Sequence, residues 1–257
     1  MRAAVKDAGA LALTYFKTDL KQWHKASNDP VTEADIAIDR LLYDRLMAAR
    51  PGYGWLSEES EDDRSRIGRE HVWIIDPIDG TRAFLKGKPH FTICAALVRH
   101  GKPVAGVVFN PVTDEFFEAV AGAGAQLNGG PIRVSDRQEI SGCRMMAHGQ
   151  TFKHPRWSKT SSEPWPEMEI IERNSVAYRL ALVASGTADA ALVLSAKNDW
   201  DLAAPDLIVR EAGGRFTSHD GRPFIYNKDF TRHRSVLAAG PRLYETLYAR
   251  VGHLALP

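Results

Sequence analysis

Hydrophobic and polar positions follow a helical rhythm at the beginning of the chain. Residues 1 to about 20 carry apolar side chains at helical spacing, and residues 32–50 repeat this pattern up to the helix-breaking pair Pro51-Gly52. Recurrence at three and four residues is typical of an amphipathic helix. We therefore predict two helices, joined by a polar link over residues 21–30. Lys25 in this link could reach a functional site, but a solvated lysine is the favoured interpretation.

Short apolar runs separated by turn residues follow the two helices. Turn signals stand at His100-Gly101 and Asn110-Pro111, and Gln126 to Gly129 suggests another tight turn. Consecutive strands at such short spacing indicate an antiparallel meander. The runs that we predict to form this meander are 91–98, 102–109 and 115–120, and two separate strands are predicted before them at 53–57 and 72–75.

A different alternation begins after a polar stretch at residues 135–142. Short apolar runs now alternate with helical patterns, which indicates a layered α/β half. We predict strands at 145–146, 169–171, 190–194, 215–216 and 236–238, and helices at 176–185, 201–212 and 241–251. The chain is therefore expected to form two closely joined halves, residues 1–138 and 139–257.

Composition and charge exclude several classes of function. The 257 residues are 44% hydrophobic and 25% charged, as in a soluble globular protein, and the formal net charge is +1. This balance predicts no binding to a nucleic acid polymer or a membrane. No signal peptide or spanning run is visible, and Cys94 and Cys143 are too few for a disulfide framework. We expect a cytoplasmic enzyme.

The chemistry of the chain concentrates where the apolar run 72–75 ends. Asp76-Pro-Ile-Asp-Gly-Thr81 places two carboxylates, a proline and a glycine within six residues. Pro77 removes a backbone donor, and Gly80 permits a positive φ or a close backbone approach. We predict that the strand ends at Asp76, that Asp76 and Asp79 point into one pocket, and that nearby backbone N–H groups face an anion. An ordinary Asp-Pro/Asp-Gly turn is the alternative.

Three further carboxylates stand at the ends of predicted elements. Asp35 completes Thr32-Glu-Ala-Asp35, which has the form of a capping box, and a carboxylate beside the positive end of a helix stays ionised and is able to orient a water. Glu58 ends the predicted strand 53–57, and Asp201 opens a predicted helix, where an N-cap is the alternative role.

Four segments in order make the sequence resemble the inositol monophosphatase family. They are Asp29 to Asp35, Ser57 to Ser60, the strand with Asp76 to Thr81, and Trp200 to Gly214. The resemblance implies a layered α-β-α-β-α sugar-phosphatase fold, with an antiparallel N-terminal sheet and a mixed C-terminal α/β half. It also implies a Mg²⁺-dependent, lithium-sensitive phosphatase that forms a homodimer and acts on a small phosphorylated metabolite.

The resemblance also implies a set of metal ligands. Glu58, Asp76 and the Ile78 carbonyl would hold a first metal, and Asp76, Asp79 and Asp201 a second, with Glu58 also touching a third, weaker site. Oxygen ligands without Cys or His favour Mg²⁺, with Mn²⁺ as a substitute. Two or three ions are therefore expected.

In the mechanism that the resemblance implies, a water oriented by Asp35 and Thr81 attacks phosphorus in line. The metals would clamp the attacking and leaving oxygens. Asp79 belongs to the predicted phosphate site, and the N–H groups of Gly80 and Thr81 would hold phosphate oxygens. No phosphoenzyme is needed.

The identity of the phosphate ester rests on departures from the family pattern. Inositol-preferring members carry a glutamate about seven residues before the aspartate of the Trp-Asp pair, where this chain has Leu194. Lys197 stands nearby, and Arg82-Ala83 replaces the Thr-Asn that often follows the Gly-Thr pair. Extra cations at Arg82 and Lys197 suit a second phosphate, so we favour a 3′(2′),5′-bisphosphate nucleotidase.

Other functions stay open from the sequence. Within the family these are an inositol-1-monophosphatase and a histidinol-phosphate phosphatase. Outside catalysis, the chain could be a regulatory binding protein. The basic and aromatic segment 148–166 is interpreted either as a second phosphate or base site or as a surface loop with tryptophans on the core.

Overall fold

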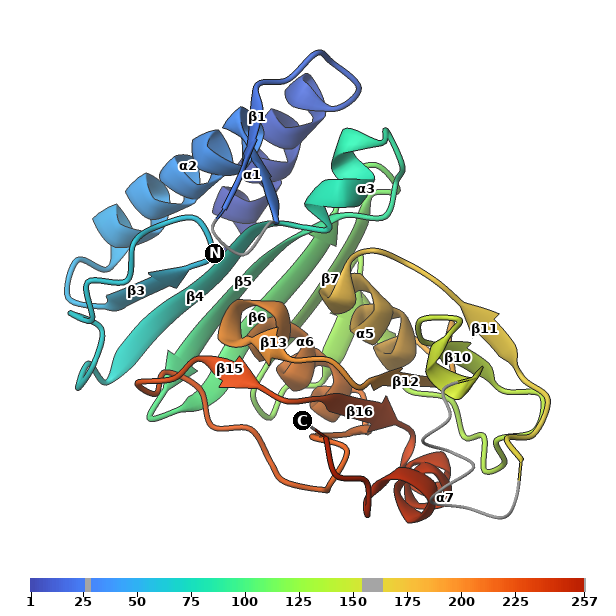
Figure 1. Cartoon of the computed structure of the whole chain (residues 1–257). Helices are drawn as coiled ribbons and strands as arrows, with labels where there is room; N and C mark the ends of the chain where they lie inside the picture. Colours follow the sequence, from blue (N-terminus) through green and yellow to red (C-terminus); the bar gives the residue numbers. More distant parts are fainter. Residues whose placement is uncertain (26–28, 154–163, 257) are drawn as a thin grey trace.

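A long twisted sheet supports one half of the molecule (Figure 1). The computed structural model describes residues 1–25, 29–153 and 164–256. Within these ranges seven strands pair in the order β3-β4-β5-β6-β7-β8-β9, with β3 parallel to β4 and every later pair antiparallel. The strands are β3 (Gly54–Ser57), β4 (His71–Asp79), β5 (Thr92–Arg99), β6 (Lys102–Asn110), β7 (Glu115–Val120), β8 (Ala125–Leu127) and β9 (Gly130–Ile132). The predicted antiparallel meander is confirmed.

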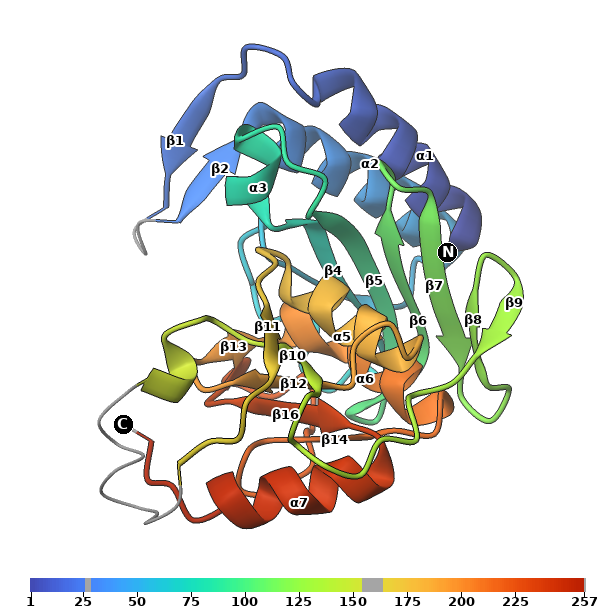
Figure 2. The ribbon, with the colours of Figure 1, turned by 90° about the vertical axis from the view of Figure 1, so that its right-hand side faces the viewer.

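Helices cover both faces of this sheet (Figures 1 and 2). On one face lie α1 (Arg2–Tyr15) and α2 (Glu33–Ala49), whose apolar residues form one core with the inner side of β4 to β7. On the other face lie α5 (Val176–Ala184) and α6 (Asp199–Glu211), at the centre of a second core. Burial of these two stripes of apolar side chains fixes the orientation of each helix.

A second, mixed sheet packs on the far side of α5 and α6. Its described strands run in the order β11-β10-β12-β16-β14, parallel across β11-β10-β12 and antiparallel across β12-β16-β14. They are β10 (Arg144–Met146), β11 (Glu169–Ile171), β12 (Ala190–Val193), β14 (Arg215–Thr217) and β16 (Val236–Ala239), and α7 (Pro241–Val251) covers the outer face (Figure 2). The layers therefore follow the predicted α-β-α-β-α order. The boundary near residue 138 stays a prediction.

The link between the first two helices corrects the prediction of an irregular polar segment. It contains two short paired strands, β1 (Gln22–His24) and β2 (Pro30–Thr32). The helix α1 also ends at Tyr15 rather than near residue 20, because Phe16 is extended and its ring packs against Phe84 and Phe91 at centroid distances of 5.6 and 5.3 Å. Aromatic packing here outweighs the continued helical spacing of the sequence.

The prediction that the strand ends at Asp76 is wrong, because β4 continues to Asp79. Asp76 pairs with Cys94 and Asp79 with Thr92, so β4 uses one residue more than β5 over this stretch. Such a bulge re-aims side chains at the end of a strand. Directly after it, Gly80 adopts φ 101° and starts the short helix α3 (Thr81–Leu85).

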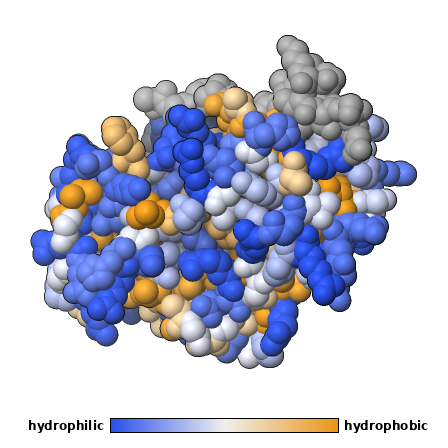
Figure 3. Space-filling model, turned by 90° about the horizontal axis from the view of Figure 1, so that it is seen from below, coloured by the Kyte–Doolittle hydropathy of each residue, from blue (hydrophilic) through white to orange (hydrophobic). Residues whose placement is uncertain are grey.

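The remaining short elements lie near the edges. They are the paired strands β13 (Lys197–Asn198) and β15 (Arg232–His233) and the 3-10 turn η1 (Thr151–Lys153). Seen from below, the surface carries hydrophobic residues in small patches between hydrophilic ones (Figure 3). Within the described ranges, no helix is both long and apolar enough to cross a lipid bilayer.

Candidate active site

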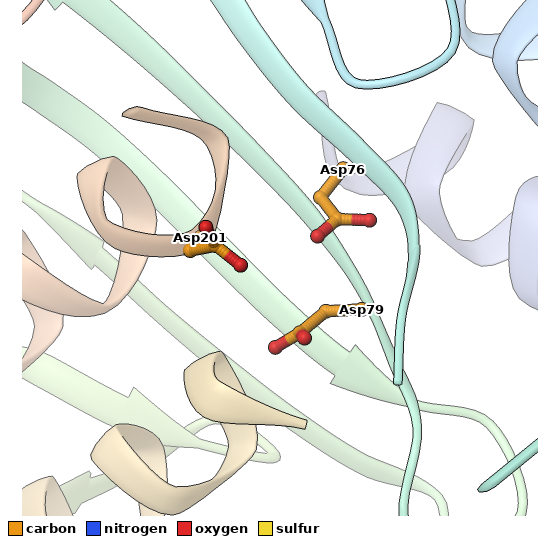
Figure 4. Close-up of side chains that lie close together, drawn as sticks. All are labelled: Asp76, Asp79 and Asp201. Atoms are coloured by element: carbon orange, nitrogen blue, oxygen red, sulfur yellow. The ribbon is translucent and has the colours of Figure 1, made fainter. Parts of the chain in front are cut away.

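Three carboxylates meet between the end of β4 and the beginning of α6. One oxygen from each of Asp76, Asp79 and Asp201 lies within 4.8 Å of the others (Figure 4). The bulge of β4 supplies two of these side chains and the first turn of α6 supplies the third. Residues that are 122 or more positions apart in the sequence therefore contribute to one acidic cluster.

Asp76 carries the strongest sign that this cluster holds a cation. Neither of its carboxylate oxygens has a hydrogen-bond partner among the described residues, although the residue is 1% exposed. Burial, followed by the charges of Glu58, Asp79 and Asp201, raises the pKa of Asp76 well above its ordinary value. A buried carboxylate without a donor is costly unless a cation compensates it.

Asp79, the second aspartate of β4, accepts hydrogen bonds from the beginning of α5. Asp79 Oδ2 accepts hydrogen bonds from Ser175 Oγ at 2.7 Å and from the backbone N–H of Ala177 at 2.6 Å. These donors belong to the beginning of α5, where Ser175 is the N-cap residue. Burial raises the pKa of Asp79 and the donors counteract the rise. The sequence analysis missed Ser175, although a serine just before a helical pattern is a capping signal.

The position of Asp201 corrects the alternative that it caps a helix as the N-cap residue. The N-cap of α6 is Asn198, and Asp201 is the third helical residue, whose Oδ2 accepts the backbone N–H of Asn198 at 2.6 Å. Burial and the charges of Asp79 and Glu58 raise the pKa of Asp201 to about 8. This capping box holds one carboxylate oxygen and directs the side chain into the cluster.

The donor set of the cluster fits a hard divalent cation. All of the groups are oxygens, two of the three residues are buried, and every one has a pKa that burial raises first and neighbouring carboxylates raise further. Carboxylate and carbonyl oxygens are the ligands that Mg²⁺ prefers, and a bound cation would remove the repulsion.

Glu58 lies at the edge of this cluster rather than within the 4.8 Å group. Lys25 Nζ donates to Glu58 Oε1 at 2.9 Å and to Glu59 Oε1 at 2.7 Å. Lys25 therefore reaches the site, the less favoured of its two interpretations from the sequence, and is not merely solvated. Burial, together with the charges of Glu58 and Asp35, raises the pKa of Glu59 to about 7 in spite of Lys25. The ammonium compensates part of the acidic charge beside the cluster.

Asp35 and Thr81 come together as predicted. Asp35 Oδ2 accepts the N–H and the hydroxyl of Thr32 at 2.7 and 2.5 Å, so the capping box is present, and Asp35 Oδ1 lies 3.3 Å from Thr81 Oγ1. Burial raises the pKa of Asp35 to about 6, with Glu58 adding to the rise. The carboxylate therefore has one oxygen fixed by the helix end and one beside the threonine hydroxyl.

Gly80 is required by the geometry of the turn between these groups. At φ 101°, a Cβ on this residue would lie 2.8 Å from the His90 carbonyl oxygen and 3.2 Å from the Ser175 nitrogen. Only glycine accepts both the left-handed backbone and this close approach. The turn thus places Thr81 against Asp35, while the beginning of α5 contacts Asp79.

These residues surround a cavity of about 610 Å³. Both predicted substrate cations line it: Arg82 is paired with Asp29 at 3.2 Å, and Lys197 Nζ donates to the Ala196 carbonyl at 3.1 Å. The sequence analysis did not select Arg232, which β15 places beside β13 at the same cavity. The predicted site residues in the lining are Glu58, Ile78, Asp79, Gly80, Thr81, Arg82, Lys197 and Asp201, whereas Asp35 and Asp76 lie behind it.

Comparison with known proteins agrees with this arrangement. A family model described as the inositol monophosphatase family matches residues 1–254. The chain belongs to the inositol monophosphatase family. It is a metal-dependent phosphomonoesterase of that family.

Relatives in this phosphatase family carry two kinds of name. The inositol-1-monophosphatase of Rhizobium meliloti is 40% identical over 201 residues, which cover 77% of this chain and 75% of the relative. The Nus factor SuhB of Pasteurella multocida is 32% identical over 260 residues, with 98% and 93% covered. The solved extragenic suppressor protein suhB of Bartonella henselae superposes with a TM-score of 0.84 at 31% identity, over 99% of this chain and 98% of that chain.

Proposed function

We propose that this phosphatase uses Mg²⁺ at the acidic cluster to hydrolyse a small phosphorylated metabolite. Glu58, Asp76, the Ile78 carbonyl, Asp79 and Asp201 would hold two or three ions, with Mn²⁺ as a substitute. The observation that carries the proposal is Asp76, whose two buried oxygens have no hydrogen-bond partner among the described residues and lie in a cluster at the 610 Å³ cavity.

Divalent ions at such a site would neutralise the phosphate and stabilise the attacking and leaving oxygens of an in-line displacement. The chain's own residues would position the other reactants. Asp35, with a pKa of about 6, is mostly ionised at neutral pH. With its Oδ1 beside Thr81 Oγ1, it would accept a proton from a water and orient its oxygen toward phosphorus. The N–H groups of Gly80 and Thr81 would hold the phosphate oxygens.

Cations at the cavity support a finer proposal on the substrate. Arg82, Lys197 and Arg232 line it together, and they suit an ester that carries a second phosphate. We therefore favour 3′(2′),5′-bisphosphate nucleotidase activity. Inositol-1-monophosphatase activity, the name of the Rhizobium meliloti relative, is the first alternative, and histidinol-phosphate phosphatase activity is the second.

The test is phosphate release with Mg²⁺ from inositol 1-phosphate, 3′-phosphoadenosine 5′-phosphate, histidinol phosphate and fructose 1,6-bisphosphate. Asp201→Asn is the control, because it removes a charge from the cluster and keeps the side-chain shape. One dominant substrate, with release abolished by a chelator, by lithium and by the substitution, supports the proposal. Equal release by wild type and Asp201→Asn contradicts it.

A regulatory role is the candidate of another class, because the Pasteurella multocida relative is a Nus factor. Retention of the whole carboxylate cluster favours catalysis. A partner that binds equally well after metal removal would indicate a regulatory protein. We also propose, from the family resemblance, that the enzyme is cytoplasmic and a homodimer. Sedimentation of the purified protein would test the homodimer.

A further inference from the structure

A second cavity adjoins the first and differs from it in charge. It has a volume of about 410 Å³ and shares Asn174, Val176 and Lys197 with the larger cavity. No acidic residue lines it among the residues that the structure describes, whereas Asp29, Glu58, Asp79 and Asp201 line the larger one. The two cavities thus adjoin, and we refer to them together as the substrate space, with an acidic end at the carboxylate cluster and a cationic end in the smaller cavity.

The cationic end contains Arg179, a partly buried residue in the second turn of α5. Its Nε donates to the Arg173 carbonyl at 2.5 Å, and within the described ranges it has no carboxylate partner within 4.0 Å. Burial lowers the pKa of Arg179, and the charges of Asp79 and Glu172 counteract part of this fall. By contrast, the fully buried Arg66 pairs with Asp62, and Arg210 pairs with Asp206.

The same helix end serves both cavities. Ser175 and Ala177 hold Asp79 of the acidic cluster, and Arg179 follows two residues later on α5. A guanidinium that is anchored through Nε keeps its terminal nitrogens as a planar pair of donors, which matches phosphate oxygens. Between the two ends, Val176 and Leu194 provide apolar surface for the carbon skeleton of a ligand.

We propose that the second cavity binds a second phosphate group of the substrate, with Arg179 as the residue that selects for it and Lys197 as the cation between the two ends. The proposal rests on the proposed function, because it assumes that the scissile phosphate lies at the acidic cluster. It assigns the enzyme to metabolites with two phosphates on one small skeleton, and it makes Arg179 a specificity determinant that the sequence motifs did not indicate.

Matched substrates test this assignment. 3′-Phosphoadenosine 5′-phosphate and adenosine 3′-phosphate differ only in the second phosphate, as do inositol 1,4-bisphosphate and inositol 1-phosphate. We expect the wild type to favour one bisphosphate over its monophosphate by about 10- to 100-fold in kcat/KM, the range of a charge-assisted hydrogen bond. Arg179→Met should remove this preference through KM, and Arg179→Lys should keep part of it.

Arg40→Met is the matched control, since Arg40 is exposed on α2 and lines neither cavity. It should leave the preference intact. A wild type without preference in either pair, or an equal loss by Arg179→Met on both members of a pair, overturns the proposal. If metal-dependent release from the monophosphates persists in that case, the proposed function stands and only the second phosphate site falls.

Binding gives a readout that is independent of turnover. Adenosine 5′-phosphate carries only the second phosphate, and in a chelator the acidic cluster repels it. Calorimetric titration of the metal-free wild type should then give binding that Arg179→Met weakens about tenfold or more and Arg40→Met does not. Equal binding by all three proteins contradicts the role of Arg179.

Discussion

The two ends of the substrate space show opposite solutions to the same problem of buried charge. At the acidic end, Asp76, Asp79 and Asp201 lie within 4.8 Å of one another and their pKa values are raised. At the cationic end, Arg179 donates to the backbone carbonyl of Arg173 and has a pKa that burial lowers. In each region the protein disfavours the charged form, and in each an ionic ligand of opposite sign would restore it.

This contrast indicates where a ligand completes the structure. Elsewhere in the described chain, buried carboxylates are paired internally, as Asp189 is with Arg144 and Asp206 is with Arg210. Charged side chains that the fold brings together without an ion-pair partner need opposite charge from a ligand. The acidic end therefore suits cations, and the cationic end suits the phosphate of a substrate.

Removal of one charge from the acidic end should have the largest effect. Asp79→Asn keeps an oxygen that accepts from Ser175 and Ala177, so the fold should persist. The loss of a metal ligand should lower kcat by about 10³-fold or more, since even one hydrogen-bond donor to a transition state contributes about 10²- to 10³-fold. Phosphate release and circular dichroism would measure the two properties.

The control for Asp79→Asn is Asp189→Asn, at a buried aspartate that pairs with Arg144 at 3.0 Å outside the site. This change should reduce stability by about 1–3 kcal/mol, because it weakens a buried charged hydrogen bond, and should retain activity. A less stable active variant beside a stable inactive one would separate structure from catalysis. Near-normal turnover by Asp79→Asn would be incompatible with its assignment.

Metal removal should have the next largest effect, and the effect should depend on pH. The pKa values of Asp35, Glu59 and Asp201 are raised to about 6, 7 and 8 by burial and neighbouring carboxylates. A raised pKa stabilises the folded state below the ordinary value of the group, and this contribution is lost as pH rises through the folded value. The metal-free protein should therefore have a lower Tm at pH 8 than at pH 5.5.

Mg²⁺ should reverse this loss at pH 8 more than at pH 5.5, because it binds the deprotonated cluster. At a concentration of 100 Kd it contributes about 2.7 kcal/mol, which corresponds to a rise in Tm of about 5–10 °C for a chain of this size. Differential scanning calorimetry in chelator and in Mg²⁺ would measure it. A metal-free Tm that is equal at the two pH values, or higher at pH 8, would refute this account of the cluster.

The sequence predicted the acidic end better than the cationic end for a physical reason. Asp76 and Asp79 lie in a compact motif, and Asp35 and Asp201 lie in the first turns of helices, where capping boxes form. By contrast, Arg179 lies within an apolar helical segment and looks like any surface residue of a helix. Its exposure to a cavity depends on how α5 packs between two sheets, which no local pattern encodes.

Element ends were also hard to predict where tertiary contacts decide them. Local propensity placed the end of the strand at Asp76, because Pro77 follows, yet β4 continues because a bulge accommodates the proline beside β5. The sequence favoured a solvated Lys25 over one that reaches the site, because its partners Glu58 and Glu59 are 33 and 34 positions away. Only the folded chain brings that ion pair together.

The smallest effect is expected from a cation at the rim of the substrate space. Arg82 pairs with Asp29, but their side chains are 61% and 54% exposed, so water and salt screen the charges. Arg82→Ala should change stability by less than about 0.5 kcal/mol and should raise KM for the bisphosphate only about two- to fivefold. That rise should disappear in high salt, whereas the loss in Arg179→Met should persist because its site is partly buried. Steady-state kinetics at low and high salt would measure both variants. If Arg82→Ala had the larger and more salt-resistant effect, the second phosphate would lie at the rim and not beside α5.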